Sequence, residues 1–177
     1  MQAEFIKVPS AYQHRLFFSS NQIKFTQIEG FEEAMETIPF IYELTSLELG
    51  IEGIKKPWED KGHTVIPKLL KLWEEKQKVL NLLFEERKRK ETKEPMMWSI
   101  VIFLNFLFWS NGQNVSGLTN LQESVHSIPF KPINVVERLG FIIENPGQYH
   151  SFIQLSELFT EYKKQYYKQK LLSVSKK

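Results

Sequence analysis

The pattern of apolar and polar residues changes most sharply at 96–109, a stretch without charge whose only polar side chains are Ser99 and Asn105. As a helix it would span about 21 Å, which is shorter than the roughly 30 Å hydrocarbon core of a bilayer. A helix that is apolar on nearly all sides is typical of the interior of a helical domain. The stretch therefore predicts a buried central helix at about 95–110 and no insertion into a membrane.

Apolar residues at three- and four-residue spacing predict further helices on both sides of this stretch. Prolines and glycines separate the periodic segments, because proline is best tolerated in the first turn of a helix and glycine often follows its end. The predicted fold class is all-α, a compact single-domain bundle of about five or six helices around the central one. The other predicted helices are 31–37, 40–47, 65–89, 135–144 and 148–171.

Polar residues at the helix starts and between the helices refine this picture. Thr64 can cap the helix that follows it. Asn134, with Glu137 three residues later, is close to a capping box for the helix that begins there. Residues 113–131 are largely polar and predict a connection with one helical turn near 118–125.

The two ends of the chain differ from its centre. Residues 1–30 combine turn signals with apolar side chains such as Phe5 and Phe17, which predicts an arm packed on the body rather than a free tail. The helical domain is then expected to span 31–172. Residues 173–177 are expected to form a basic tail.

Composition narrows the class of protein. The chain has 177 residues, of which 42% are hydrophobic and 25% charged, as in a globular domain. It has no cysteine, so disulfides, thiolate nucleophiles and cysteine metal sites are excluded, and a reducing compartment is favoured. Residues 1–30 lack the basic start and apolar segment of a signal peptide, so we expect a cytoplasmic protein.

Charge is unevenly distributed along the chain. The net charge is +2, but residues 161–177 hold six lysines and one glutamate and carry +5, which leaves −3 for the rest. Lysines interleaved with tyrosines can contact phosphates and stack on bases. The favoured interpretation is a solvated helix end whose tyrosines bury their rings and leave their hydroxyls in water. The candidate nucleic-acid contacts are Lys163, Lys164, Tyr167, Lys168 and Lys170.

Two other segments invite a nucleic-acid interpretation and favour a simpler one. The run EERKRKE at 85–91 mixes four basic residues with three acidic ones, which is typical of a solvated face with local ion pairs. The turn at 145–147 between two helices resembles a helix-turn-helix, and the residues after it start polar, at Gln148. The aromatic band that follows is more typical of a core.

Catalytic and metal-binding motifs are missing from the sequence. It has no glycine-rich phosphate loop, no nucleophile elbow and no dinucleotide fingerprint. Glu123 and His126 match one Glu-x-x-His unit of a di-iron bundle, but such a site needs two units. Glu137 and Glu144 fall on one side of a helix, yet paired catalytic carboxylates need a cleft that the sequence does not show. We therefore expect no catalytic residue, no metal and no cofactor.

Several motifs resemble a known family. FLFWSNG at 106–112, KPINVVERLGFI at 131–142 and PGQYHSFIQL at 146–155 resemble the YpoC-like family of small proteins from Bacillus-type bacteria, and PFIYE at 39–43 and PWE at 57–59 match its earlier part. The resemblance covers about 38–165. It implies a helical fold in a bacterial cytosol, and the family is uncharacterised. Genes of such relatives often lie beside replication-initiation and DNA-repair genes, which associates the family with DNA.

Four polar residues within these motifs lack a plain structural explanation: Asn111, Lys131, Arg138 and Gln154. If they converge, they form a polar patch for a partner. Arg138 is also expected to pair with Glu161 or Glu157 on the last helix. The sequence thus predicts a non-enzymatic interaction or accessory protein with an unknown protein partner. The alternative is weak nucleic-acid binding through the basic C-terminal helix, in DNA replication or repair.

Overall fold

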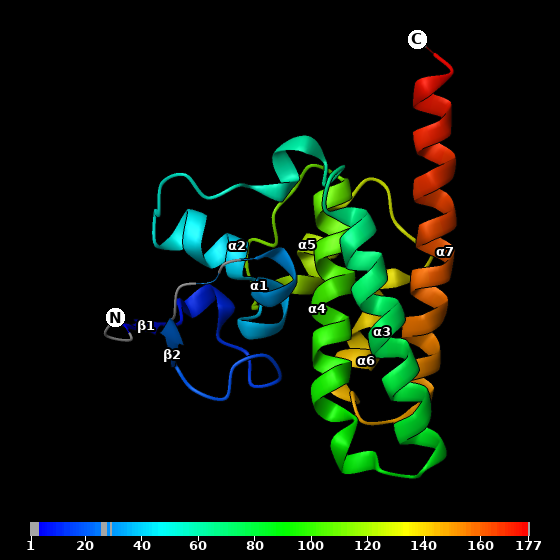
Figure 1. Cartoon of the computed structure of the whole chain (residues 1–177). Coiled ribbons are helices and arrows are strands. Elements are labelled where there is room, and N and C mark those ends of the chain that lie inside the picture. The colour runs from blue at the N-terminus through cyan, green and yellow to red at the C-terminus, as the bar shows by residue number, and fades with distance from the viewer. Residues whose placement is uncertain (1–3, 26–27, 29, 177) are drawn as a thin grey trace.

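The computed structural model of the chain describes residues 4–25, 28 and 30–176, which are mostly helical, as predicted (Figure 1). Its helices exceed the expected five or six because residues 121–127, expected as a single turn within a connection, form a short helix of their own. The α-helices are α1 (Phe31–Thr37), α2 (Ile41–Glu43), α3 (Ile66–Glu85), α4 (Lys93–Ser110), α5 (Leu121–Ser127), α6 (Val135–Glu144) and α7 (Tyr149–Val174).

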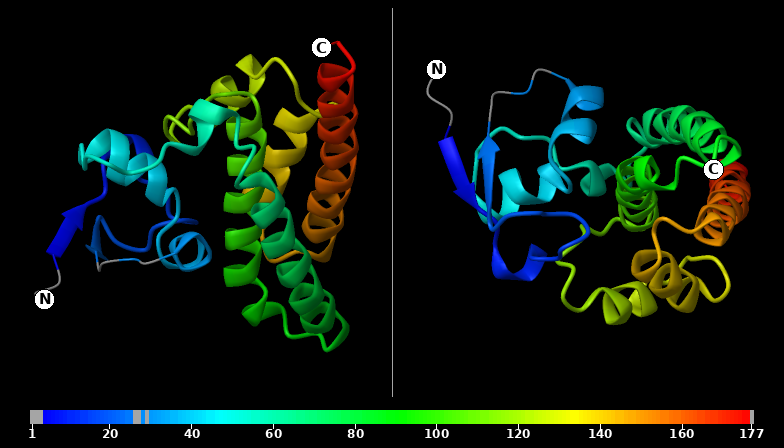
Figure 2. Two further views of the ribbon diagram at one scale, coloured as in Figure 1. Left: turned by 45° about the horizontal axis from the view of Figure 1, so that its top comes forward. Right: turned by 90° about the horizontal axis from the view of Figure 1, so that it is seen from below.

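The uncharged stretch forms α4, the buried helix that its composition predicted. Every side chain from Trp98 to Trp109 is buried, and Phe103, Phe106 and Trp109 are fully so. Burying each such side chain contributes about 1.5–3 kcal/mol relative to leaving it exposed. Seen from below, α4 lies between the N-terminal segments and the other long helices, α3 and α7 (Figure 2).

Aromatic side chains join α3 to α7 beside this central helix. Trp73 of α3 stacks on Phe159 of α7, with ring centroids 4.1 Å apart and planes 6° from parallel. Phe84, near the end of α3, stacks on Phe152 of α7 at 5.4 Å. These pairs follow from the three- and four-residue spacing of apolar residues, which turns one face of each helix toward its neighbour. The last turns of α7 then run past the end of the bundle (Figure 1).

The prediction of a purely α fold is wrong at the N-terminus. Strands β1 (Glu4–Lys7) and β2 (Gln22–Phe25) pair antiparallel, with Ile6 opposite Ile23. Polar and apolar residues alternate along β2, and its side chains alternate between exposed and half-buried. That alternation is the strand pattern, but four residues are few against the turn signals around them.

The segment between the strands packs on the body. Val8 and Tyr12 are fully buried, and the Tyr12 hydroxyl donates a hydrogen bond to the Val115 carbonyl at 2.5 Å. The Leu118 N–H donates to the Ala11 carbonyl at 2.7 Å. At Gly117 an added Cβ would lie only 2.9 Å from the Ala11 oxygen, so a side chain there would disturb this contact. Residues 1–3, 26, 27 and 29 of the predicted arm lie outside the described residues.

Neither predicted side-chain cap is formed, although Asn134 does occupy the N-cap position of α6. Asn134 adopts a left-handed backbone, with φ of +56°, and its side chain makes no capping bond, because an N-cap side chain requires an extended backbone. The residue preceding α3 is Val65, while the Thr64 hydroxyl accepts a hydrogen bond from Lys55 Nζ. The single turn expected near 118–125 is α5, which begins and ends later.

The last helix also differs at its end, since α7 continues to Val174 and takes in the start of the predicted tail. Lys177 of that tail lies outside the described residues. Among the residues that the structure describes, no helix combines the length and apolar character needed to cross a bilayer.

Candidate functional site

Asn111, the first residue of the predicted polar patch, follows the last turn of α4 and holds three segments together. Its amide Nδ2 donates to the carbonyls of Leu107 at 2.8 Å and Phe130 at 2.9 Å, and its Oδ1 accepts from the Phe130 N–H at 3.1 Å. The Tyr162 hydroxyl accepts from Nδ2 at 3.0 Å and lies 2.7 Å from the Ser110 hydroxyl. We call Ser110, Asn111, Phe130 and Tyr162 the Asn111 network.

Tyr162 closes this network from α7. Its ring is fully buried and its hydroxyl donates to the Phe130 carbonyl at 3.2 Å. Burial raises the pKa of Tyr162 to about 12, although the hydrogen bonds from Ser110 and Asn111 act in the opposite direction. The expectation that its hydroxyl would stay in water is therefore wrong. The network satisfies its own polar groups and joins the end of α4 to α7 and to the segment before α6.

Lys131 follows Phe130 but serves a different helix. Its Nζ donates to the carbonyls of His126 at 2.9 Å and Ile128 at 2.6 Å. These carbonyls end α5, where the helix leaves its acceptors unpaired and where a cation is favoured by the helix dipole. Lys131 thus caps α5.

Arg138 and Gln154 do come together. Arg138 Nε donates to Gln154 Oε1 at 3.1 Å, and its two terminal nitrogens bind both oxygens of Glu161, at 2.9 and 3.0 Å. Glu157 lies 3.7 Å away, so both predicted acidic partners are found. The Arg138 side chain is only 16% exposed, and this fork ties α6 to α7.

The structure thus joins Arg138 to Gln154 and engages Asn111 and Lys131 in hydrogen bonds of their own. In the described part of the chain, no hydrogen bond joins Asn111 or Lys131 to Arg138 or Gln154. Each of the four side chains forms hydrogen bonds with other groups of the protein. Polar residues within the apolar motifs thus serve to connect the helices of this chain.

An open groove lies between α5 and α6, and sequence reasoning did not find it. It encloses about 400 Å³, and none of the four predicted residues lines it. Its walls carry Leu118 and Val125 on one side and Val136, Leu139 and Ile143 on the other. The pattern that could have indicated the groove is the spread of apolar residues around α6, which is wider than contact with α7 requires.

Two carboxylates border this groove. Glu123 on α5 and Glu144 on α6 are both exposed, and neither forms an ion pair within the described residues. Glu137, which the spacing placed beside Glu144, does not line the groove. His126, the second residue of the Glu-x-x-His unit, does not line it either, and the described residues hold no cluster of metal-ligating side chains.

His14 reaches the groove from the N-terminal segment. Its Nδ1 accepts a hydrogen bond from the Leu16 N–H at 3.2 Å. Burial, together with the positive charge of Arg15, lowers the pKa of His14 below its usual value of 6.5. The imidazole is therefore neutral at pH 7, and the net charge of the groove lining is negative.

Buried Glu43 of α2 is a second feature that the sequence did not reveal. Its Oε1 accepts hydrogen bonds from Trp109 Nε1 at 2.8 Å and from the Val115 N–H at 3.2 Å, while its Oε2 has no partner among the residues that the structure describes. Complete burial raises the pKa of Glu43 to about 7, although these bonds lower it. The carboxyl joins the N-terminal part to the end of α4.

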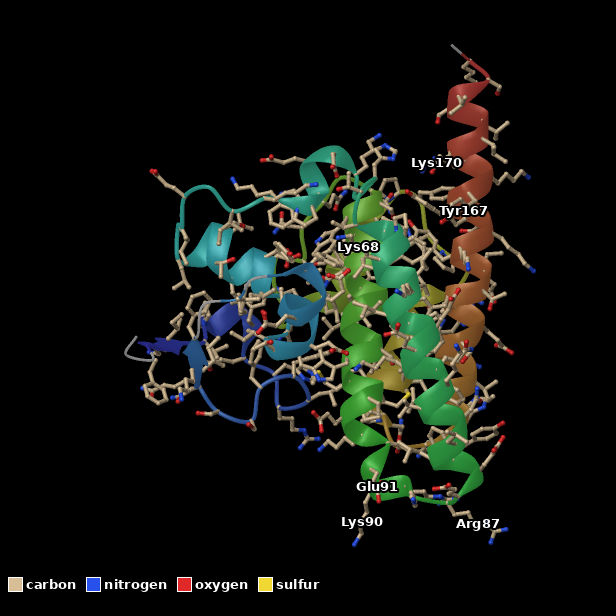
Figure 3. The ribbon with its side chains drawn as sticks, in the orientation of Figure 1. Lys68, Arg87, Lys90, Glu91, Tyr167 and Lys170 are labelled. Atoms are coloured by element: carbon tan, nitrogen blue, oxygen red, sulfur yellow. The ribbon has the colours of Figure 1, made fainter. Side chains whose placement is uncertain are left out.

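The candidate nucleic-acid contacts lie on α7, where Tyr167 and Lys170 mark its projecting end (Figure 3). Lys163 pairs with Glu74 of α3 at 3.3 Å. Lys164 and Lys168 are exposed and form no ion pair in the described chain. Tyr166 and Tyr162 are buried, and Tyr167 is 37% exposed, so it alone of the three presents part of its ring to solvent.

Comparisons with known proteins concern the helical body. A family model described as YpoC-like protein matches residues 63–174. "Uncharacterized protein YpoC" of Bacillus subtilis (strain 168) is 43% identical over 112 residues, which cover 63% of this chain and 68% of the relative. The family match begins after the resemblances at 39–43 and 57–59 and extends beyond residue 165. No solved structure matches.

Proposed function

This chain belongs to the YpoC-like family, and we propose that it is a non-enzymatic interaction protein of the bacterial cytosol. In this proposal the groove between α5 and α6 binds a basic, amphipathic segment of a protein partner. The observation that carries it is the pair of unpaired carboxylates, Glu123 and Glu144, above an apolar floor.

The chemistry of the groove favours this kind of partner. A lysine or arginine can lay its aliphatic stem on the half-buried Val136 and Ile143 and bring its charge to the carboxylates at the rim. Apolar residues at helical spacing on the same segment would fill the rest of the floor, as in other complexes of a helix in a groove. Gly140 leaves room in the α6 wall, because a Cβ there would meet only Gln122 Nε2, at 3.5 Å.

The proposal is tested with a labelled helical peptide that carries leucines at three- and four-residue spacing and lysines between them. We expect saturable binding, measured by fluorescence anisotropy, and at least tenfold weaker binding to the double variant Glu123→Lys with Glu144→Lys. Gly140→Met, which fills the groove, should act alike. The control is Glu75→Lys, an exposed charge reversal on α3, away from the groove.

Three outcomes would contradict the groove proposal. A control peptide carries glutamates in place of the lysines. Equal binding of the two peptides would exclude charge complementarity. An equal loss in Glu75→Lys would point to bulk charge instead of the groove. Unchanged binding to Gly140→Met would place the peptide elsewhere.

A second candidate function is weak nucleic-acid binding through the end of α7, in DNA replication or repair. Exposed Lys164 and Lys168 beside the partly exposed ring of Tyr167 favour it. Binding to single- and double-stranded DNA should then fall steeply as salt is raised, because counterions are released when lysines neutralise phosphates. Lys164→Gln with Lys168→Gln should reduce that slope. No binding at low salt would exclude this function.

A further inference from the structure

A second open pocket lies at the tip of the α3–α4 hairpin, at the end of the bundle opposite the projecting end of α7. Figure 3 shows Arg87 and Lys90 at this tip, far from Tyr167 and Lys170. The pocket encloses about 570 Å³ and shares no lining residue with the groove. It is lined by Asn81, Phe84, Glu85, Arg87, Arg89 and Tyr149.

One wall of this tip pocket is aromatic. Tyr149, the first residue of α7, is 57% exposed and meets Phe84 edge to face, with ring centroids 5.4 Å apart. Phe84 is itself stacked on buried Phe152, which holds its ring in place. An aromatic pair that is fixed from behind and open in front offers a planar ligand a surface on which to stack.

The lining of the tip pocket also carries two cationic side chains. Arg87 and Arg89 are exposed, and neither forms an ion pair in the described chain, whereas Lys88 between them pairs with Glu86 at 2.6 Å. Glu85 is the one acidic residue of the lining. Two unpaired guanidinium groups present the forked donors that match phosphate oxygens.

The backbone of Arg87 adds an independent observation. Its φ is +58°, and it follows Glu86, the C-cap residue of α3, at a turn where the Lys88 N–H donates a hydrogen bond to the Leu83 carbonyl at 2.8 Å. Helices with this ending usually place glycine at such a residue, because a side chain is strained there. The chain keeps an arginine where the fold alone favours glycine. A solvated turn requires neither this arginine nor an open aromatic wall.

We propose that the tip pocket binds a nucleotide unit. The base stacks on Tyr149 and Phe84, and the phosphate is bound by Arg87 and Arg89. The Asn81 amide and the Glu85 carboxylate, one helical turn apart on α3, can accept hydrogen bonds from amino groups of the base. A free mononucleotide and a nucleotide within a single strand share this chemistry.

The test compares binding of AMP, adenosine and inorganic phosphate by NMR titration of the whole chain. We expect AMP to bind at least tenfold more tightly than either part alone, because base and phosphate contact different walls. Arg87→Gly should weaken AMP binding at least tenfold without lowering the melting temperature, since glycine relieves the backbone strain. Tyr149→Ala should reduce AMP binding to the level of phosphate.

Lys71→Gln, an exposed change on α3 outside the pocket lining, serves as the control and should bind AMP as the original chain does. Tighter binding of a short oligo(dA) than of AMP would identify a single strand as the source of the nucleotide, and equal binding would identify a free nucleotide. The proposal is overturned if AMP binds no better than phosphate, or if Arg87→Gly binds AMP unchanged.

Discussion

The Asn111 network and the α5–α6 groove lie in the same helical body and differ in how their polar groups are used. In the network, Asn111 donates a hydrogen bond to the Tyr162 hydroxyl, and both side chains bond to the Phe130 main chain. In the groove, Glu123 and Glu144 stand over apolar side chains and have no ion-pair partner among the described residues.

This difference shows which polar residues stabilise the fold and which remain available to a ligand. Removing one partner from a satisfied network leaves buried groups unpaired and costs stability. Removing an unpaired exposed carboxylate changes the free energy of unfolding little, because that carboxylate interacts with water and not with another group of the protein. Substitutions in the two regions should therefore separate stability from binding.

The largest expected effect is a loss of folding stability at the buried contacts between helices. Trp109→Ala should lower the free energy of unfolding by about 3–5 kcal/mol, because it empties a fully buried site and removes a donor to Glu43. Urea unfolding followed by circular dichroism measures this loss. Tyr149→Ala, which truncates an exposed aromatic side chain, is the control, and an equal loss in both variants would contradict the role given to Trp109.

Asn111→Ala should lower the free energy of unfolding by about 2 kcal/mol, because the Phe130 main chain loses both a donor and an acceptor. The same urea titration measures it. Asn120→Ala, at the groove, should change stability by less than about 0.5 kcal/mol. If the two asparagines prove equivalent, the distinction between network and groove is lost.

Glu43 makes the folding stability of the chain sensitive to pH. Its pKa is raised from 4.5 to about 7 in the folded chain, so the folded state holds the proton more tightly. Stability from this group is therefore lost as pH rises from about 4.5 to 7, and the penalty is fully present above 7. Glu43→Gln should raise the free energy of unfolding at pH 8 by about 1–2 kcal/mol.

Melting temperatures measured between pH 4.5 and 8 test this assignment to Glu43. The original chain should lose stability with rising pH relative to Glu43→Gln, which keeps an oxygen for Trp109 and cannot ionise. Parallel pH profiles of the two chains would show that another group is responsible.

The smallest effect should appear at the groove. Gly140→Ala should raise the free energy of unfolding by about 0.5–1 kcal/mol, because alanine favours the helix and its Cβ makes only an ordinary contact. Gly117→Ala should do the opposite, since its Cβ would approach the Ala11 carbonyl too closely. Thermal unfolding of both variants measures the difference. A change in stability of the same sign at Gly140 and Gly117 would contradict the contrast between the open groove and the tight contact with Ala11.

Local patterns predicted much of the fold. The helix at 135–144 is found with those bounds, and Arg138 meets both acidic residues that the spacing placed on the facing helix. The strand pair was missed because β2 is short and its partner lies at the other end of a loop. The side-chain cap predicted at Asn134 is absent because the backbone of this residue is left-handed, which local sequence spacing does not reveal.

The candidate site depended on long-range contacts. Asn111 attracted attention as a polar residue in an apolar motif, but its partner Phe130 lies 19 residues away, and no local pattern encodes that pairing. The groove requires α5 to lie beside α6 at a distance that leaves Val136 and Ile143 partly uncovered. The strained backbone of Arg87 is likewise invisible in the run of charges around it.

The amino-acid order alone determined that this chain builds a mostly helical body around an uncharged helix, because the periodic burial of apolar side chains depends only on neighbours three and four residues apart. The tertiary structure decided which polar groups form hydrogen bonds between helices and which remain available to a ligand. That outcome depends on contacts between residues distant in the chain, where a single partner within hydrogen-bonding distance converts a candidate ligand contact into a structural one.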